Sequence, residues 1–388
     1  MKHGWDYKKL GELVQVLNGY AFKSSLYENQ GIRVLRITNV QKGNIVDDDP
    51  KYYPLSLTDE IRNYLLKEND LLMSLTGNVG RVGLLTKEML PAALNQRVAC
   101  LRILSNGLNL GFLFHYLNSD KFEQDAVLSA KGIAQKNMST EWLKDYKLPL
   151  PPISVQQTIV SELDKINELI RLKKEQLKDY DNLAQSIFYE MFGDPVVNEK
   201  GWEVKKLGEL CVSKLKYGSG ASAVDFDGNI RYVRITDINE DGTLNNDIKS
   251  PNIVDDEYLL NVGDIVFARS GATVGKTYLH RKNNIKCLYA GYLIKATLNT
   301  KMALPIYVFQ FTQSKYYKDW VNLNARAVAQ PNINAKQYGD LQIPLPPLTL
   351  QQVFAQRIEL IEQQKDEIKS TIADLETLLA SRMQYWFD

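Results

Sequence analysis

The sequence predicts an α+β fold in which two repeated β-rich modules are joined by two long antiparallel coiled-coil helices with pseudo-two-fold symmetry. Three observations predict it: an internal repeat at a nearly constant offset, short β-type runs in each copy, and a 3.5-residue apolar repeat that closes each copy. The segments are a first module at 1–153, a helix at 154–192, a linker at 193–201, a second module at 202–348 and a helix at 349–388.

Matching blocks follow one another in the same order in the two halves of the chain. The first reads GWDYKKLGEL at residues 4–13 and GWEVKKLGEL at residues 201–210, with eight of ten positions identical. Further matches join RVLRIT to RYVRIT, SLTGNVGR to ARSGATVGK, AQKN to AQPN, and LPLPPISVQQ to IPLPPLTLQQ, always 194 to 198 residues apart. Because chance does not hold one offset over five separate blocks, we interpret the chain as the duplication of one unit.

Short β-type runs separated by turn residues fill the first part of each copy, which predicts a β-rich module. The clearest runs are Ile32–Val40 and Asp70–Leu75 in the first copy, and Tyr232–Ile238 and Asp264–Ala268 in the second. Each module is expected to end at its proline-rich block, because proline lacks the N–H group that would continue a sheet or a helix.

A long helix is predicted after each proline-rich block. Ser154 with Gln157, and Thr349 with Gln352, fit a capping box, in which both side chains bond to free backbone groups at a helix start. The following apolar residues step by 4 and 3, so each helix must pack along its length on another helix. The residues expected to form this helix pair and partner interface are Ile159, Leu163, Ile166, Leu177, Phe354, Ile358, Ile361, Ile368, Ile372 and Leu375.

Lysines interrupt both seams near the middle, at Lys173 and Lys365. They either extend to solvent or fix the register of the pair, and we favour extension to solvent. The linker between Gly193 and Gly201 spans at most ~30 Å, so the second module must begin near the end of the first helix. Antiparallel helices meet this condition easily.

The composition is that of a globular protein and offers little material for catalysis. Of the 388 residues, 44% are hydrophobic and 24% are charged. No apolar run approaches the ~18 residues of a membrane span, and the first ten residues lack a secretory core, so we expect a cytoplasmic protein without membrane contact. Three scattered cysteines and three histidines predict neither a disulfide framework nor a metal site.

Positive charge is concentrated slightly in the modules. Residues 1–153 hold 19 Lys and Arg against 16 Asp and Glu, and residues 201–348 hold 18 against 14. The helical segments are acidic. The modules are therefore the candidates for binding a polyanion.

The block SGATVGKT in the second copy nearly matches a phosphate-binding P-loop, which requires Gly, four residues and then Gly-Lys-Ser/Thr. Ser270 replaces the first glycine, Gly271 leaves the spacing one residue short, and the following Tyr-Leu continues as a strand. We interpret the block as a glycine turn between strands, with Arg81 and Lys276 at its exit in the two copies. With no other catalytic motif, the chain by itself is not expected to be an enzyme.

The doubled arrangement of these motifs resembles the specificity subunit of type I restriction–modification enzymes. The resemblance covers essentially the whole chain. It implies two target-recognition domains, each reading one half of a bipartite, asymmetric site in double-stranded DNA. It also implies that the helices recruit two methyltransferase (modification) subunits and that restriction subunits join this core. S-adenosylmethionine, ATP and Mg²⁺ are then handled by those partners, and this chain binds no cofactor or metal.

The chain is accordingly expected to be the non-catalytic recognition subunit of a type I site-specific deoxyribonuclease and DNA methyltransferase complex. Stiff helices predict half-site centres roughly 10 base pairs apart across an unread gap. The alternative is a protein-binding adaptor without DNA readout.

Residues of the matched loops are expected to contact phosphates or a groove, although Gln and Asn there can instead simply close a loop. We expect Arg36 and Arg234, in strand-like runs, to be structural. The DNA-binding candidates are Arg81, Lys131, Gln135, Lys136 and Asn137 in the first module and Arg269, Lys276, Arg326, Gln330 and Asn332 in the second.

Overall fold

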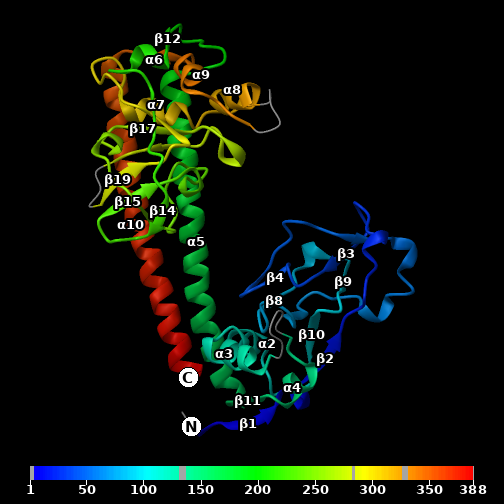
Figure 1. The fold of residues 1–388 in the computed structure, drawn as a ribbon. Coiled ribbons are helices and arrows are strands. Elements are labelled where there is room, and N and C mark those ends of the chain that lie inside the picture. The colour runs from blue at the N-terminus through cyan, green and yellow to red at the C-terminus, as the bar shows by residue number, and fades with distance from the viewer. Residues whose placement is uncertain (1–3, 131–136, 282–284, 326–330, 388) are drawn as a thin grey trace. The chain divides into compact units, whose positions relative to one another are not determined.

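The computed structural model divides into two compact units, each built from one module and part of each long helix. Unit 1 comprises residues 1–172 and 372–388, and unit 2 comprises residues 173–371. The two long helices are α5 (Ile153–Phe192) and α10 (Leu348–Phe387) (Figure 1). The structure describes residues 4–130, 137–281, 285–325 and 331–387.

A four-stranded antiparallel sheet of order β2-β10-β7-β8 forms the centre of unit 1. Beside it lie a three-stranded sheet of order β6-β3-β9, in which β3 and β9 are parallel, and a β4–β5 hairpin. Strands β1 and β11 pair the start of the module with its end. The bounds are β1 Asp6–Lys9, β2 Val14–Asn18, β3 Ile32–Leu35, β4 Val40–Gln41, β5 Asn44–Ile45, β6 Tyr52–Tyr53, β7 Leu71–Ser74, β8 Val82–Leu84, β9 Ala92–Leu94, β10 Val98–Ile103 and β11 Lys147–Leu150.

Unit 2 repeats the central sheet, the parallel pair and the pairing of the module's start with its end, whereas its remaining strands pair differently. Its antiparallel sheet has the order β13-β20-β17-β18, β15 and β19 form a parallel pair, β14 pairs with β16, and β12 pairs with β21. The predicted duplication is thus confirmed at the level of strand order. The bounds are β12 Glu203–Lys206, β13 Lys216–Tyr217, β14 Ala223–Asp225, β15 Ile230–Val233, β16 Lys249–Pro251, β17 Ile265–Ala268, β18 Thr277–Leu279, β19 Lys286–Tyr289, β20 Leu293–Ala296 and β21 Gln342–Leu345.

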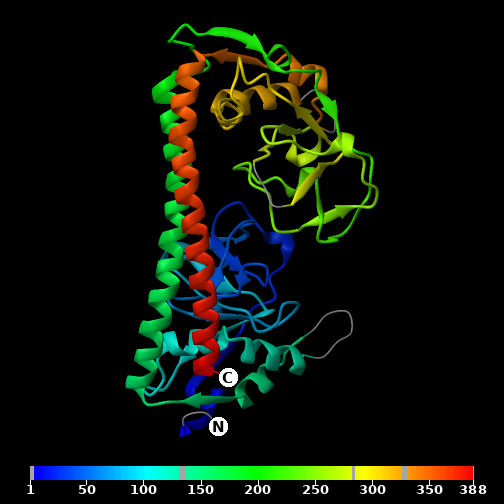
Figure 2. The same cartoon turned by 90° about the vertical axis from the view of Figure 1, so that its left-hand side faces the viewer.

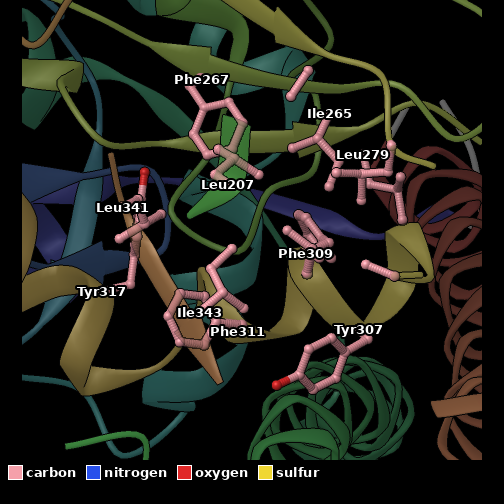
Figure 3. Close-up of a cluster of buried hydrophobic side chains, with 14 of the residues drawn as sticks. Leu207, Ile265, Phe267, Leu279, Tyr307, Phe309, Phe311, Tyr317, Leu341 and Ile343 are labelled. Atoms are coloured by element: carbon pink, nitrogen blue, oxygen red, sulfur yellow. The ribbon is translucent and has the colours of Figure 1, made fainter. Parts of the chain in front are cut away.

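Short helices cover one face of each central sheet and complete its core. In unit 2, Phe267 of β17 packs with Phe309, Tyr317 and Leu341, as the close-up shows (Figure 3). The short α-helices of unit 1 are α1 Leu10–Leu13, α2 Leu110–Leu117, α3 Asp120–Ser129 and α4 Thr140–Asp145, and those of unit 2 are α6 Leu207–Leu210, α7 Pro305–Phe311, α8 Lys315–Ala325 and α9 Ala335–Gly339. Single 3-10 turns lie at Ser24–Leu26, Leu55–Leu57, Arg62–Tyr64, Lys87–Met89, Ile235–Asp237, Asp256–Tyr258 and Gly271–Thr273.

Within each unit the segments of α5 and α10 run side by side and antiparallel, as predicted (Figure 2). In unit 1, Glu162 of α5 accepts hydrogen bonds from the Arg382 guanidinium and from the Trp386 indole of α10, the latter at 3.1 Å. In unit 2, the rings of Phe192 and Phe354 lie 5.0 Å apart. Later positions on α5 therefore meet earlier positions on α10.

Lys365 does not extend to solvent, and that expectation was wrong. The residue is only 7% exposed, and its ammonium group donates to the Asp181 carboxylate of α5 at 2.6 Å. Burial lowers the pKa of Lys365, but the hydrogen bond to Asp181 and the charge of Glu362 outweigh it, so the pKa is raised overall. Lys173 is half-buried and donates to Gln176 on its own helix.

Most of the predicted seam is buried, and the seam also packs into the modules. Ile159 and Leu163 belong to the core of unit 1, whereas Phe354, Ile358 and Ile361 belong to the core of unit 2. Each module is therefore anchored on its helices by shared apolar packing. Ile166, Ile368 and Ile372 are also buried, and Leu177 and Leu375 are half-buried.

The predicted capping boxes are wrong, because the helices begin one residue before Ser154 and Thr349. The first glutamine of each pair has a different role. Gln156 is fully buried, accepts from the Asn109 N–H at 2.8 Å, and donates to the carbonyl groups of Gly107 and Pro151. Its counterpart Gln351 makes the three equivalent bonds in unit 2. Both helices are therefore bonded to their modules in the same way.

Two of the predicted strand runs are shorter than expected. The strands end at Leu35 and Val233, because a side chain four residues later caps a turn. Asn39 accepts from the Arg36 N–H at 2.9 Å, and Asp237 accepts from the Arg234 N–H at 2.9 Å. The β-type residues after these points therefore lie in turns.

Candidate nucleic-acid interface

A glycine turn connects the last two strands of each central sheet. In unit 1 it joins β7 to β8, with Gly77 at φ 75° and Gly80 at φ 81°. In unit 2 it joins β17 to β18, with Gly271 at φ 70° and Gly275 at φ 86°. These left-handed conformations favour glycine. Because a strand follows the second turn, the interpretation as a turn and not a P-loop is confirmed.

The asparagine that ends the repeated Ala-Gln-x-Asn motif contacts this turn in both units. Asn137 forms a bridge with Thr76, whose hydroxyl group donates to the Asn137 carboxamide oxygen at 2.8 Å. Asn332 forms the equivalent bridge with Ser270 and accepts from Arg269 at 3.4 Å. Two blocks that are distant in the sequence thus meet at one edge of the central sheet. We call this edge, formed by the glycine turn and the residues bonded to it, the glycine edge of each unit.

Arg81 and Lys276 lie at equivalent places where the turn leaves for the last strand. Arg81 donates to the Gln41 carboxamide at 2.6 Å, and Lys276 pairs with Glu240 at 2.9 Å. Both side chains are half-buried and are oriented by these polar partners. The position therefore keeps its positive charge in both copies while its partner changes from a neutral amide to a carboxylate.

Arg269 differs from Arg81 and Lys276 because it lies over an aromatic ring. Its guanidinium carbon lies 4.8 Å from the ring centre of Tyr217, a geometry that favours a cation–π interaction. The Tyr217 hydroxyl group accepts from the Ala335 N–H at 3.1 Å, which fixes the ring. The predicted residues Lys131, Gln135, Lys136, Arg326 and Gln330 lie outside the described residues.

Arg36 and Arg234, which we expected to be structural, are both paired with carboxylates. Arg36 pairs with Asp49, and Arg234 pairs with Asp237 and Asp247. The hydrogen bond from Arg234 lowers the pKa of Asp247. These arginines therefore stabilise the turns that follow β3 and β15.

Sequence reasoning missed several residues of the glycine edge. Exposed Arg97 and Tyr292 precede the strands β10 and β20, and their carbonyl groups accept from the N–H groups of Leu75 and Arg269 at 3.0 Å in both units. Tyr217 is the last residue of the short strand β13, which pairs with β20. None of these residues lies in a repeated block, so the comparison of the two copies could not identify them.

A matched pair of glycines next to this edge was also missed. A Cβ on Gly19 would lie 2.2 Å from the Asn95 carbonyl group, and a Cβ on Gly218 would lie 2.2 Å from the Ala290 oxygen. The backbone therefore approaches at the same place in both units. The two glycines are 199 residues apart, just outside the offset of the other blocks, and the residues around them differ.

The family model of the type I restriction modification DNA specificity domain matches residues 2–179 and again residues 199–377. The chain belongs to this family. Both copies of the specificity domain are thus present, which explains the internal repeat.

Curated relatives of this specificity-domain chain are specificity subunits. The EcoBI specificity subunit of Escherichia coli is 23% identical over 95% of this chain and 81% of its own length. The EcoKI subunit of Escherichia coli strain K12 is 22% identical over 96% of this chain and 85% of its own length. The EcoAI subunit of Escherichia coli is 32% identical, but the match spans only 43% of this chain and 29% of that subunit.

Solved structures show the same fold. The S subunit of a type I restriction–modification system from M. genitalium matches all of this chain and 98% of its own with a TM-score of 0.55 and 16% identity. A chain from a study of complex assembly and conformational transition of the type I R-M system matches with a TM-score of 0.56 and 19% identity. The predicted fold class, two repeated modules with two long helices, is confirmed.

The described part of the chain contains neither a cluster of metal-ligating residues nor a membrane-spanning helix. Across the described ranges, no three His, Cys, Asp or Glu residues gather as a metal site would require. None of the helices in that part of the chain is both long enough and apolar enough to span a bilayer.

Proposed function

We propose that this chain reads a bipartite, asymmetric DNA site, one half-site per module, as the non-catalytic recognition subunit of a type I restriction–modification complex. The observation that carries the proposal is that two modules with the same strand order in their central sheets present different side chains at the same glycine edge. A shared scaffold with different contact residues is what recognition of two different half-sites requires.

The two kinds of residue at the glycine edge divide the work. Arg81 and Lys276 are matched between the modules and provide positive charge at the turn exit, which suits phosphate contacts that position the duplex. Residues that differ between the modules suit base contacts in a groove. The half-site centres are expected roughly 10 base pairs apart, because each reader must meet the same side of the duplex.

We also propose that the helices scaffold the catalytic partners. Exposed leucines lie on the outer faces of α5 and α10, among them Leu169, Leu172, Leu360 and Leu378, and they offer apolar surface to two methyltransferase subunits, which restriction subunits then join. S-adenosylmethionine, ATP and Mg²⁺ are assigned to these partners, and the complex is expected to act on DNA in the cytoplasm.

The test measures DNA binding by the chain assembled with its methyltransferase subunits, using pooled random duplexes over a range of salt concentrations. We expect the logarithm of affinity to fall linearly with the logarithm of salt, with a slope of about −0.9 per phosphate contacted. Sequencing of the bound fraction should show two short conserved elements and a gap. A flat salt response without sequence enrichment would favour the adaptor.

A further inference from the structure

The two glycine edges can be compared position by position, because the strand pairing defines which residues are equivalent. Ser74 of β7 pairs with Val98, and Ala268 of β17 pairs with Leu293. The next residues are Leu75 and Arg269, and each donates its N–H to the carbonyl group before the neighbouring strand at 3.0 Å. Leu75 and Arg269 therefore occupy the same place in the two modules.

The positions around them also differ in chemistry. Asn18 of β2 in unit 1 is equivalent to Tyr217 of β13 in unit 2, since Asn18 pairs with Ala99 of β10 and Tyr217 pairs with Ile294 of β20. The residue that precedes β10 in unit 1 is Arg97, and the residue that precedes β20 in unit 2 is Tyr292. One backbone frame thus carries Asn, Leu and Arg in the first module, and Tyr, Arg and Tyr in the second.

The Arg269 guanidinium is held in place without an ion pair. Its guanidinium carbon lies 4.8 Å from the ring centre of Tyr217, and the Asn332 carboxamide accepts from its Nε–H at 3.4 Å. Within the described ranges no carboxylate pairs with Arg269, whereas Arg102 and Arg234 pair with aspartates. The positioned planar fork is suited to a two-point acceptor.

The guanidinium lies beside exposed aromatic surface. Tyr217 is 42% exposed and Tyr292 is 62% exposed, and both are at the glycine edge. Tyrosines at an edge of this kind can pack against sugars and bases while an adjacent guanidinium bonds to the base edge.

We propose that Arg269, stacked on Tyr217, reads a guanine in the half-site of the second module. This inference rests on the proposed function and names a specificity-determining residue within it. Guanine O6 and N7 form the two-point acceptor that an arginine fork recognises in the major groove. A phosphate is the other acceptor of this shape, but phosphate contacts carry no sequence information and are expected at matched positions such as Arg81 and Lys276. Arg269 is replaced by Leu75 in the other module, as a base contact would be.

The experiment compares methylation by the complete complex of this chain and its modification subunits on duplexes in which each base pair of both half-sites is varied singly. With Arg269→Ala we expect discrimination to fall about 5- to 150-fold at one G·C pair of one half-site, with the other half-site unchanged. Arg269→Lys should lose it too, because a lysine keeps the charge but not the fork. Tyr217→Phe should retain the preference, since the ring remains, whereas Tyr217→Ala should weaken it.

Two controls separate the outcomes. Arg97→Ala removes an exposed arginine from the glycine edge of unit 1 and must not affect the base that responds to Arg269. If Arg269→Ala instead weakens binding equally on all sequences and reduces the salt slope by about 1, the residue contacts a phosphate and the inference is overturned. An unchanged preference overturns it as well. If the complex without any substitution shows no base preference in either half-site, the proposed function itself fails.

Discussion

The buried glutamine at the start of each long helix gives the sharpest stability prediction. Gln156 is 0% exposed, and replacement by alanine removes three hydrogen bonds at 2.8, 2.9 and 2.8 Å to Asn109, Gly107 and Pro151. Gly107 is exposed, so water can replace the lost donor there. The Pro151 carbonyl group is buried and the Asn109 N–H group is half-buried, and each unsatisfied group costs about 1–3 kcal/mol.

We therefore expect Gln156→Ala to lower the free energy of unfolding by about 2–4 kcal/mol. Gln156→Glu conserves volume but points a carboxylate oxygen at the Pro151 carbonyl group, so a comparable loss shows that the bonds matter and not the cavity. The neighbouring Gln157 is exposed, which makes Gln157→Ala a matched control with an effect within about 0.5 kcal/mol.

The assay is urea unfolding of the full chain, combined with hydrogen exchange read by mass spectrometry. Gln156→Ala should increase exchange in the peptide that contains α2, and Gln351→Ala should increase exchange in the peptide that contains α7, each in its own unit. Equal effects of Gln156→Ala and Gln157→Ala would refute the assigned role, as would a loss below 0.5 kcal/mol for both buried glutamines.

Three further predictions concern charge and backbone. Lys365→Met should leave stability unchanged or raise it, whereas Asp181→Ala should cost about 1–2 kcal/mol. This loss lies below the range for fully buried pairs because Asp181 is 43% exposed. Urea midpoints of the two variants and of the double variant check this prediction, and a larger loss for Lys365→Met than for Asp181→Ala would contradict it. Burial lowers the pKa of His280 below its usual 6.5, so its contribution to stability is present above pH 6.5 and is lost as the pH falls through the lower folded-state value. Thermal melts between pH 7.5 and 5 should show this slope and should lose part of it in His280→Gln; an identical slope in that variant would exclude His280 as the source. Gly275→Ala should cost about 2–4 kcal/mol, because its Cβ would lie 2.5 Å from Val321. Gly271→Ala, with open space around it, should cost about 1–2 kcal/mol. Equal losses in unfolding titrations would argue against close packing of Gly275 on Val321.

The large features of the fold could be predicted because they are repeated or periodic. Duplication identified the modules, and the apolar repeat identified both helices. The glycine turn was recognised in both copies because its spacing excluded a P-loop and because two strands flanked it. These signals are local, and each appears twice.

The features that were missed depend on contacts between distant residues. The sequence of a Gln-Gln pair after a hydroxyl residue does not show which of the two glutamines bonds to the module. Only the position of the Gly107 carbonyl group in the fold identifies Gln156 as that residue. Lys365 was expected to reach solvent because its partner Asp181 is 184 positions away on another helix. Similarly, Tyr217 and Arg269 become neighbours only when β13 pairs with β20, and no repeated block records that pairing.

The most direct test of the account replaces residues 14–130 with the corresponding segment of a relative of different specificity and maps the bases methylated by the assembled complex. Reading by two independent modules predicts that one half of the recognised site changes, while the other half and the gap between them stay the same. A change in both halves, or a single continuous recognition sequence, would contradict it.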